Sequence, residues 1–426
     1  MNIEIVTIGD ELLLGFTIDT NAAHLARELS ALGVRIVRRT TAGDEPESIA
    51  SAVRDALDRT GAVITTGGLG PTADDRTKPV IAELFGRGMV MDGAILSALE
   101  ARWLKRFGHE LPASNRQQAM VPERATILDN RHGSAPGIWL EDDRGRWVAM
   151  LPGVPREMRG MLADTIMPRL QGRIGDGGSV VRSRTLRTVN ISESALADRL
   201  GDLARDTLGM SVAFLPGSEG VDLRITAAGL PAEQADALLD RAAALLRERA
   251  GNVVYGEGSD DLATLVLTAC AERQMTLAVA ESCTGGMLGG RLTGVPGASR
   301  VFEGGVIAYA NAVKTRELGV SERDIDEHGA VSEPVARAMA SGVRKKFGAR
   351  IGLSITGIAG PDGGSEEKPV GTVWVGLDLD GQVHAVKAVL PGNREEIRYR
   401  GTQMALDRVR RAFERTADSP GWTTRA

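Results

Sequence analysis

The segment Thr276–Gly286 reads TLAVAESCTGG, and it predicts the fold of the region around it. Thr276–Ala280 is a short apolar run, which is typical of a buried strand. Gly285 and Gly286 follow it and precede a helical pattern of apolar residues. A buried strand that passes through a glycine turn into a helix is the unit of an open α/β sheet, in which ligands bind at the carboxyl ends of the strands.

Two other segments of this region end apolar strands in polar loops. The strand expected at Gly305–Ala310 is followed by Lys314. The strand expected at Ile351–Thr356 leads into Thr356–Gly364, TGIAGPDGG, whose glycines allow the backbone to approach a ligand closely. We expect these loops and the Ser282 turn to meet at one edge of the sheet.

The first 170 residues repeat the alternation of strands and helices. Ile3–Ile8, Val34–Arg39 and Ala62–Thr66 are expected strands with helical patterns between them, and the last runs into Gly67–Asp75, GGLGPTADD. This alternation predicts parallel strands with crossover helices. The chain as a whole is therefore of the α/β class.

A change of pattern separates this part from the rest of the chain. Gln171–Ser179 is typical of a linker, and residues 180–255 follow a βαββαβ order that predicts a small α+β domain acting as spacer or dimer support. A second break falls at Gly256–Ser259. We expect domains at residues 1–170, 180–255 and 259–416.

The composition excludes several classes of protein. The chain has 426 residues, a formal net charge of -5 and 42% hydrophobic residues, so it requires neither nucleic acid nor an anionic membrane as a partner. Cys270 and Cys283 are its only cysteines, which argues against a disulfide framework and favours the cytoplasm.

Ser282 and Lys314 suggest covalent catalysis at the predicted edge. A serine hydroxyl needs a base, and a lysine serves as one when burial disfavours its charged form. Tyr309 is expected to relay or orient the proton. A lone serine in a glycine turn is more often plain turn chemistry, and the spacing favours Ser282 over Cys283 as nucleophile only slightly.

Three motifs carry a resemblance to a known family. Glu281–Gly286 (ESCTGG), Tyr309–Lys314 (YANAVK) and Thr356–Gly364 with Lys368–Thr372 (KPVGT) resemble the PncC family of nicotinamide mononucleotide amidohydrolases. The resemblance implies Ser282 as nucleophile, Lys314 as base and Tyr309 beside them. It implies release of ammonia from nicotinamide mononucleotide without a cofactor. The expected substrate contacts are Glu281, Cys283, Thr284, Gly285, Gly286, Thr356, Gly357, Ala359, Gly360, Gly363 and Gly364.

The N-terminal glycine segment suggests a phosphate site. Its glycines suit a phosphate cradle, whereas its acids would repel phosphate unless a divalent cation intervened. We therefore expect a metal ion there, although each acid taken singly is more often an N-cap or a solvated loop residue. The expected ligand contacts are Thr66, Gly67, Gly68, Gly70, Pro71 and Thr72, and the expected metal ligands are Asp10, Asp44, Asp74 and Asp75.

This N-terminal region resembles the molybdopterin-binding fold of the MoaB/MogA group. The residues concerned are Gly9–Leu12, Thr65–Asp75, Gly133–Gly137 and Leu151–Pro155. Together with the C-terminal motifs they resemble the CinA (competence/damage-inducible protein) family. That resemblance implies metal-dependent hydrolysis of ADP-ribose to AMP and ribose 5-phosphate, a KH-like middle domain and a homodimer. The middle segment lacks a Gly-x-x-Gly clamp, so we do not expect nucleic-acid binding.

Two alternative functions stay open at this point. A molybdopterin-handling transferase would follow from the N-terminal fold alone, but a shared fold is weak support for shared chemistry. A non-enzymatic partner in competence or recombination would need an exposed apolar or basic patch. We expect a bifunctional hydrolase of pyridine nucleotides.

Overall fold

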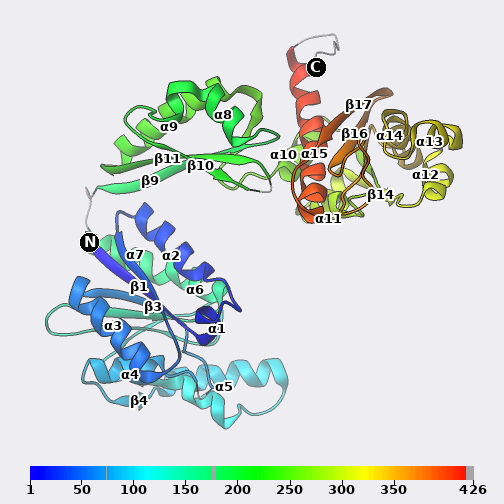
Figure 1. Ribbon diagram of the computed structural model, residues 1–426. Coiled ribbons are helices and arrows are strands. Elements are labelled where there is room, and N and C mark those ends of the chain that lie inside the picture. The colour runs from blue at the N-terminus through cyan, green and yellow to red at the C-terminus, as the bar shows by residue number, and fades with distance from the viewer. Residues whose placement is uncertain (73, 175–178, 218, 419–426) are drawn as a thin grey trace. The chain divides into compact units, whose positions relative to one another are not determined.

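The computed structural model describes residues 1–72, 74–174, 179–217 and 219–418. The chain divides into two compact units, one with Met1–Arg182 and Ala227–Leu238, the other with Ser183–Thr226 and the residues from Leu239 onward. The ribbon diagram gives the elements of each (Figure 1). Among the described residues no helix has the length and apolar character needed to cross a membrane.

The N-terminal sheet has the strand order β2-β1-β3-β8-β7-β6. Its strands β1, β2, β3 and β8 are parallel, and β6 and β7 are antiparallel additions. Their bounds are β1 Asn2–Ile8, β2 Arg35–Ala42, β3 Ala62–Thr66, β6 Thr126–Leu128, β7 Gly137–Glu141 and β8 Trp147–Leu151. The remaining strands, β4 Met89–Met91 and β5 Met120–Pro122, pair with each other.

Helices cover both faces of this sheet because its central strands β3 and β8 are buried on both sides. Ile64 packs in one core and Val63 in the other, as the alternation of a strand requires. Figure 1 shows α2, α6 and α7 on one side of the sheet and α3 on the other. The helices are α1 Asp10–Leu13, α2 Thr20–Ala31, α3 Pro46–Thr60, α4 Thr77–Leu84, α5 Gly93–Phe107, α6 Pro155–Met161 and α7 Met167–Ile174.

The linker predicted at Gln171–Ser179 is partly wrong. Helix α7 continues to Ile174, because Leu170 and Ile174 still pack on the core beneath it. Residues 175–178 of that prediction lie outside the described residues. The glycines and charges of this segment did not reveal that its first half completes a helix.

The middle segment has the predicted βαββαβ order, and its strands pair in the order β10-β11-β9-β12. The elements are β9 Val180–Thr188, α8 Glu193–Leu200, β10 Val212–Pro216, β11 Val221–Leu230, α9 Ala232–Ala250 and β12 Val254–Glu257. Val189 and Tyr255 belong to the same core cluster as the C-terminal sheet. The predicted α/β class, with a small α+β part, is confirmed.

The C-terminal sheet has the order β14-β13-β15-β16-β17. Strand β13 (Leu277–Glu281) lies between β14 (Phe302–Ile307) and β15 (Ile351–Gly357), and these strands are parallel. The antiparallel hairpin of β16 (Thr372–Leu379) and β17 (Gln382–Val389) turns at Asp380 and Gly381, which both have positive φ. An Asp-Gly pair adopts that hairpin turn readily.

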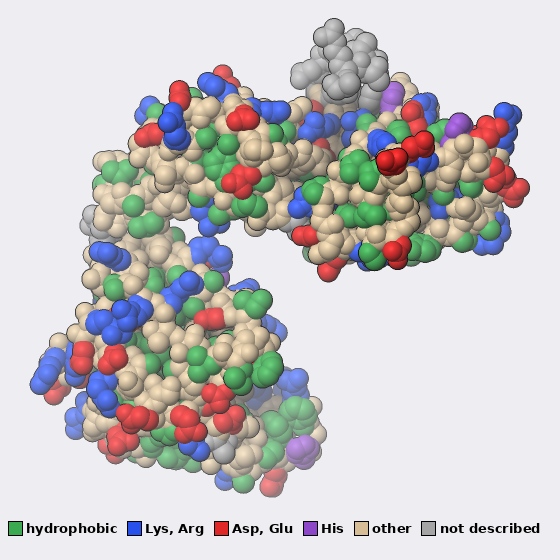
Figure 2. All heavy atoms as spheres, in the orientation of Figure 1, with side chains coloured by type: hydrophobic (Ala, Val, Ile, Leu, Met, Phe, Trp, Pro, Cys, Tyr) green, Lys and Arg blue, Asp and Glu red, His purple; other side chains and the backbone are tan. Residues whose placement is uncertain are grey.

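Helices also cover both faces of this sheet. Leu277 and Val279 pack in one core cluster, and Ala278 and Ala280 pack in the other. The helices are α10 Leu262–Glu272, α11 Met287–Thr293, α12 Asn311–Leu318, α13 Glu322–His328, α14 Glu333–Phe347 and α15 Arg394–Asp418. Acidic and basic side chains are interspersed on the face of the molecule that Figure 2 shows.

Candidate active site

Ser282 lies in the turn between β13 and α11, at the carboxyl end of the central parallel strands. Its backbone N–H donates to the Ile355 carbonyl at 2.9 Å, which fixes the turn to β15. The residue is 8% exposed. The predicted convergence of loops is borne out here, since β14 and β15 flank β13 and end at the same edge.

Lys314 brings its amine to the hydroxyl of Ser282. It lies on α12 rather than directly after its strand, and Nζ is 3.2 Å from Ser282 Oγ. The same nitrogen donates to the carbonyl oxygens of Ala308 at 2.8 Å and Tyr309 at 3.1 Å. Lys314 is 1% exposed, and this burial lowers the pKa of its amine. Among the described residues no carboxylate forms an ion pair with it.

Glu281, expected to contact the substrate, has its carboxylate bonded to backbone amides. Its buried carboxylate accepts hydrogen bonds from the backbone N–H groups of Gly286 at 3.0 Å, Leu288 at 3.1 Å and Gly289 at 2.8 Å. A negative charge at a helix N-terminus is stabilised by these donors and by the helix dipole. The first amides of α11 are therefore occupied, and Glu281 holds this helix against the serine turn.

Cys283 is a poor candidate for the nucleophile. The residue is 7% exposed, and burial raises the pKa of its thiol to about 11. The reactive form of a cysteine is the thiolate, which this environment disfavours. The serine beside it has the amine within hydrogen-bond distance instead.

The Tyr309 hydroxyl contacts Arg394, and no described hydrogen bond joins it to Ser282 or Lys314. Its side chain is 63% exposed, and its hydroxyl accepts a 3.4 Å hydrogen bond from Arg394. Only its carbonyl oxygen contacts the Lys314 amine. The prediction placed the phenol at a strand end, but β14 already ends at Ile307, so Tyr309 lies in the following loop.

The glycine loop after β15 is packed closely against the segment before β16. A Cβ at Gly357 would lie 2.8 Å from the Thr372 carbonyl oxygen, so this glycine is needed for packing. The hydroxyl of Thr356 donates to the Ala330 carbonyl at 2.8 Å. Of the expected substrate contacts, Gly285, Gly363 and Gly364 are exposed, whereas Cys283, Thr284, Thr356, Ala359 and Gly360 are buried.

Two arginines of α15 complete this site and were missed from the sequence. Arg398 donates to the carbonyl oxygens of Cys283 at 3.2 Å and Thr284 at 2.8 Å, which fixes the serine turn from the C-terminal helix. Arg394 donates to the Gly360 carbonyl at 2.6 Å and so joins the glycine loop to Tyr309. No local motif marks them, because their partners lie 34 to 115 residues earlier in the chain.

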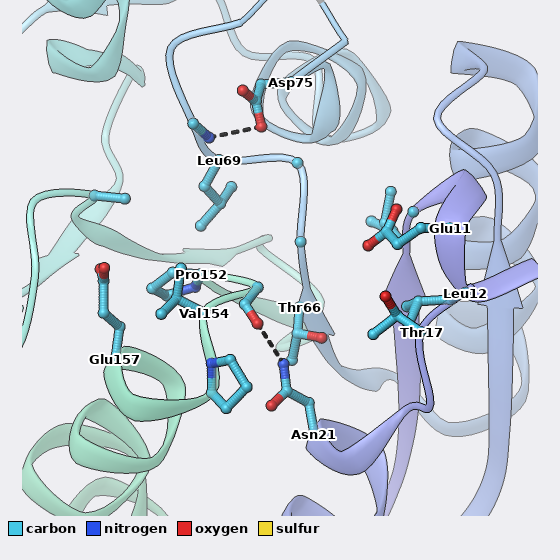
Figure 3. A pocket seen from close by; sticks show the side chains of 18 of the residues that line it. Glu11, Leu12, Thr17, Asn21, Thr66, Leu69, Asp75, Pro152, Val154 and Glu157 are labelled. Carbon is cyan, nitrogen blue, oxygen red and sulfur yellow. Dashed lines mark hydrogen bonds between the residues drawn. The ribbon is translucent and has the colours of Figure 1, made fainter. Parts of the chain in front are cut away.

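The N-terminal unit contains a cavity of about 490 Å³ at the carboxyl ends of its parallel strands. Thr66, Gly67, Gly68, Gly70 and Pro71 line it as predicted. Figure 3 shows Glu11 and Glu157 on opposite sides of it. Asn21, which donates to the Gly153 carbonyl at 2.7 Å, also lines the cavity and was missed, although the Pro152–Pro155 turn beside it was noted.

Three of the four acids expected to bind a metal, Asp10, Asp44 and Asp75, accept hydrogen bonds from backbone N–H groups. Asp10 and Asp44 each accept a hydrogen bond from the backbone N–H of the other. Asp75 accepts from the N–H groups of Gly70 at 2.7 Å and Thr72 at 2.8 Å, so Thr72 supports the loop and does not line the cavity. Burial raises the pKa of Asp44.

These acids do not fit a metal site made of protein ligands alone. Within the described ranges no group of three or more His, Cys, Asp or Glu side chains could hold a metal ion. Asp44, Asp74 and Asp75 line the cavity, but Asp10 does not. The sequence placed three of these carboxylates beside the cavity and could not show that backbone amides would occupy those of Asp10, Asp44 and Asp75.

Comparisons with known proteins cover the whole chain. Family models match at residues 4–172 (probable molybdopterin binding domain), 183–256 (damage-inducible protein CinA KH domain) and 259–413 (CinA C-terminal domain). A CinA-like protein of Gemmatimonas aurantiaca is 73% identical over 100% of both chains. Another, from Salinibacter ruber, is 45% identical over 97% of this chain and 100% of its own.

Solved structures of related proteins include the competence/damage inducible protein CihA from Agrobacterium tumefaciens. It is 36% identical and covers 36% of this chain and 94% of its own, with a TM-score of 0.35. The family assignment rests on the full-length relatives and on the matched family models. The predicted resemblance is thereby confirmed, and this chain belongs to the CinA family, with a MoaB/MogA-like N-terminal domain, a KH-like domain and a CinA C-terminal domain.

Proposed function

We propose that the C-terminal site is an amidohydrolase that deamidates nicotinamide mononucleotide, with Ser282 as nucleophile and Lys314 as base. The observation that carries this proposal is the 3.2 Å approach of the buried Lys314 amine to Ser282 Oγ. A neutral amine has two N–H groups and one lone pair. The carbonyls of Ala308 and Tyr309 accept the two N–H groups, which directs the lone pair to the serine hydroxyl.

The first half of the reaction forms an ester on the serine. Lys314 takes the hydroxyl proton while Oγ attacks the carboxamide carbon, giving a tetrahedral oxyanion. The turn amides of Cys283 and Thr284, which Glu281 does not use, are the donors that we assign to this charge. As the intermediate collapses, the C–N bond breaks and the Lys314 ammonium returns its proton to the departing ammonia.

The second half regenerates the enzyme. Water attacks the ester carbon while Lys314 accepts one of its protons, and the serine oxygen leaves and recovers that proton. The product carries a carboxylate where the substrate carried an amide. The exposed guanidinium of Arg394, beside Gly360 and near the exposed Gly363 and Gly364, supplies a cation for the phosphate of the mononucleotide.

The test is ammonia release from nicotinamide mononucleotide by the full-length protein. We expect S282A to lose at least about 1,000-fold in kcat, because nothing replaces the nucleophile. C283A is the matched control, and we expect its kcat to stay within about fivefold of the wild type. Full activity of S282A, or a greater loss in C283A, would reject the assignment.

For the N-terminal unit, the proposal is hydrolysis of ADP-ribose to AMP and ribose 5-phosphate. The support is a cavity of about 490 Å³ at a parallel strand edge, lined by a glycine turn and by carboxylates. Mg²⁺ is commonly held by one or two carboxylates together with substrate phosphates. A divalent ion would thus arrive with the nucleotide, with Asp74, or the Asp44 oxygen that does not bond to Asp10, as the protein ligand in the cavity.

The N-terminal proposal is tested by measuring AMP release from ADP-ribose before and after chelation. We expect activity that disappears with EDTA and returns with a divalent ion. Turnover that persists after chelation would reject the metal requirement. No turnover with any divalent ion would reject the proposed hydrolysis of ADP-ribose. A molybdopterin-handling protein would instead bind a pterin in this cavity without cleaving ADP-ribose.

A further inference from the structure

A second large cavity, of about 470 Å³, lies within the C-terminal unit and apart from Ser282 and Lys314. Its apolar wall comes from β17 and the residues after it, including Val386, Ala388 and Leu390. The opposite wall is a stripe of α15 that includes Arg400, Gln403 and Asp407. The turns at Asn190–Ser192 and Glu219–Gly220 of the middle segment complete the lining.

Both acidic side chains of this cavity are already neutralised. Asp407 is 2% exposed and pairs with Arg410 at 2.6 Å and Arg411 at 2.7 Å. Glu219 pairs with Arg187 and accepts a 2.7 Å hydrogen bond from the Tyr399 hydroxyl. The cavity therefore offers little uncompensated negative charge.

Two polar groups in the same wall are left without partners. The Oε1 atom of Gln403 is buried and accepts no hydrogen bond within the described chain, although the residue is only 1% exposed. The Nε atom of Arg400, three residues earlier on the same helix, is likewise buried and unbonded. Arg400 also forms no ion pair with any described carboxylate. An unsatisfied buried polar atom costs about 1–3 kcal/mol, so such a pair calls for a partner.

We propose that this cavity is a binding site for a nucleoside monophosphate. A nucleobase edge presents a hydrogen-bond acceptor beside an N–H donor, which complements the Arg400 donor and the Gln403 acceptor. The faces of the base would lie against Met404 and the apolar wall from β17. A cavity of this size lies within the usual range for small-molecule sites.

The rest of the helix stripe fits the phosphate end of such a ligand. Arg408 and Arg411 also line the cavity, five and eight residues beyond Gln403. At a rise of about 1.5 Å per residue they lie roughly 8–12 Å along the helix, the scale of a nucleoside monophosphate. A base at Gln403 and a phosphate near the Arg411 guanidinium, which it would share with Asp407, can thus be bound together.

The test uses AMP with the full-length protein and follows hydrogen–deuterium exchange by peptide. We expect AMP to protect peptides covering residues 386–391 and 400–411. AMP is also a product of the proposed N-terminal reaction, so peptides covering residues 66–75 report that site separately. Protection limited to residues 66–75, or equal protection by inorganic phosphate, would overturn the proposal for this cavity.

Variants then assign the effect to the two unpartnered groups. We expect R400M and Q403L each to weaken AMP protection of the α15 peptide about tenfold in apparent Kd. R337M removes an exposed arginine of α14 outside the cavity and is the matched control. The unfolding temperature verifies that each variant is folded. Unchanged affinity in both folded cavity variants would reject the site, whatever the outcome of the amidase assay.

Discussion

Two lysines in this molecule are buried in nearly the same way, but only one of them is a candidate for catalysis. Lys78 of α4 is 3% exposed and donates to the carbonyl oxygens of Gln117 at 3.1 Å and Gln118 at 3.2 Å. Lys314 of α12 is 1% exposed and donates to the carbonyls of Ala308 and Tyr309. Burial lowers the pKa of both amines, that of Lys78 to about 8.

The two lysines differ in the groups that contact their amines. The Lys314 amine lies 3.2 Å from the hydroxyl of Ser282, which belongs to the turn at the end of β13. Lys78 does not line the N-terminal cavity, and its described hydrogen bonds go to backbone carbonyls. A lowered pKa is therefore insufficient evidence for a catalytic lysine, and the reactive partner is what distinguishes the two.

The largest expected effect separates the two lysines in catalysis. K314M should lower kcat for ammonia release by about 10²- to 10⁴-fold, because no base remains beside Ser282. K78M should leave this activity within about twofold. Steady-state assays on both variants test the contrast, and equal losses in the two would mean that Lys314 acts only structurally.

The next effect is the pH dependence of stability caused by Lys78. Its folded pKa of about 8 lies below the ordinary value of 10.5, so the unfolded chain binds more protons between these values and stability rises with pH. Relative to K78M, the wild type should gain about 3 kcal/mol from pH 8 to pH 10.5. Urea denaturation followed by tryptophan fluorescence measures this difference, which a flat pH profile would contradict.

A smaller effect concerns the carboxylates that hold the two glycine turns. E281Q would place an amide N–H against a backbone N–H of α11, which should cost about 1–3 kcal/mol of local stability. D75N makes the same exchange at a more exposed turn, where we expect a smaller cost. Hydrogen exchange at Leu288 and Gly289, and at Gly70 and Thr72, reports each turn. A larger loss of local stability in D75N than in E281Q would contradict the expectation that the cost increases with burial.

The smallest effect is expected from Y309F. The phenol is mostly exposed and is bonded to Arg394, so its loss should change kcat less than about threefold. The carbonyl that contacts Lys314 is unaffected by the substitution. A loss of kcat above about 100-fold would instead indicate that the phenol takes part in proton transfer.

Features set by strand order were predictable from the sequence, whereas the remote partners of individual side chains were not. Ser282 and Lys314 could be paired because parallel strands end at one edge, and the strands were recognisable from their apolar runs. Glu281 and Asp75 were taken for ligand contacts because a carboxylate beside glycines looks the same whether it binds a ligand or backbone amides.

The arginines of α15 could not be predicted from the sequence for a different reason. Nothing in the local sequence distinguishes Arg398 from the other charged residues of its helix. The residues whose carbonyls it contacts lie 114 and 115 positions earlier. Only the packing of α15 against the sheet brings them together. The cavity at Arg400 and Gln403 depends on the same packing and on turns of the middle segment.

The link between α15 and the serine turn makes the geometry of that turn depend on a remote segment. Arg398 holds the carbonyls of Cys283 and Thr284 from 115 and 114 residues farther along the chain. A fragment cut between β17 and α15 would therefore keep every residue of the turn and lose the guanidinium that fixes it.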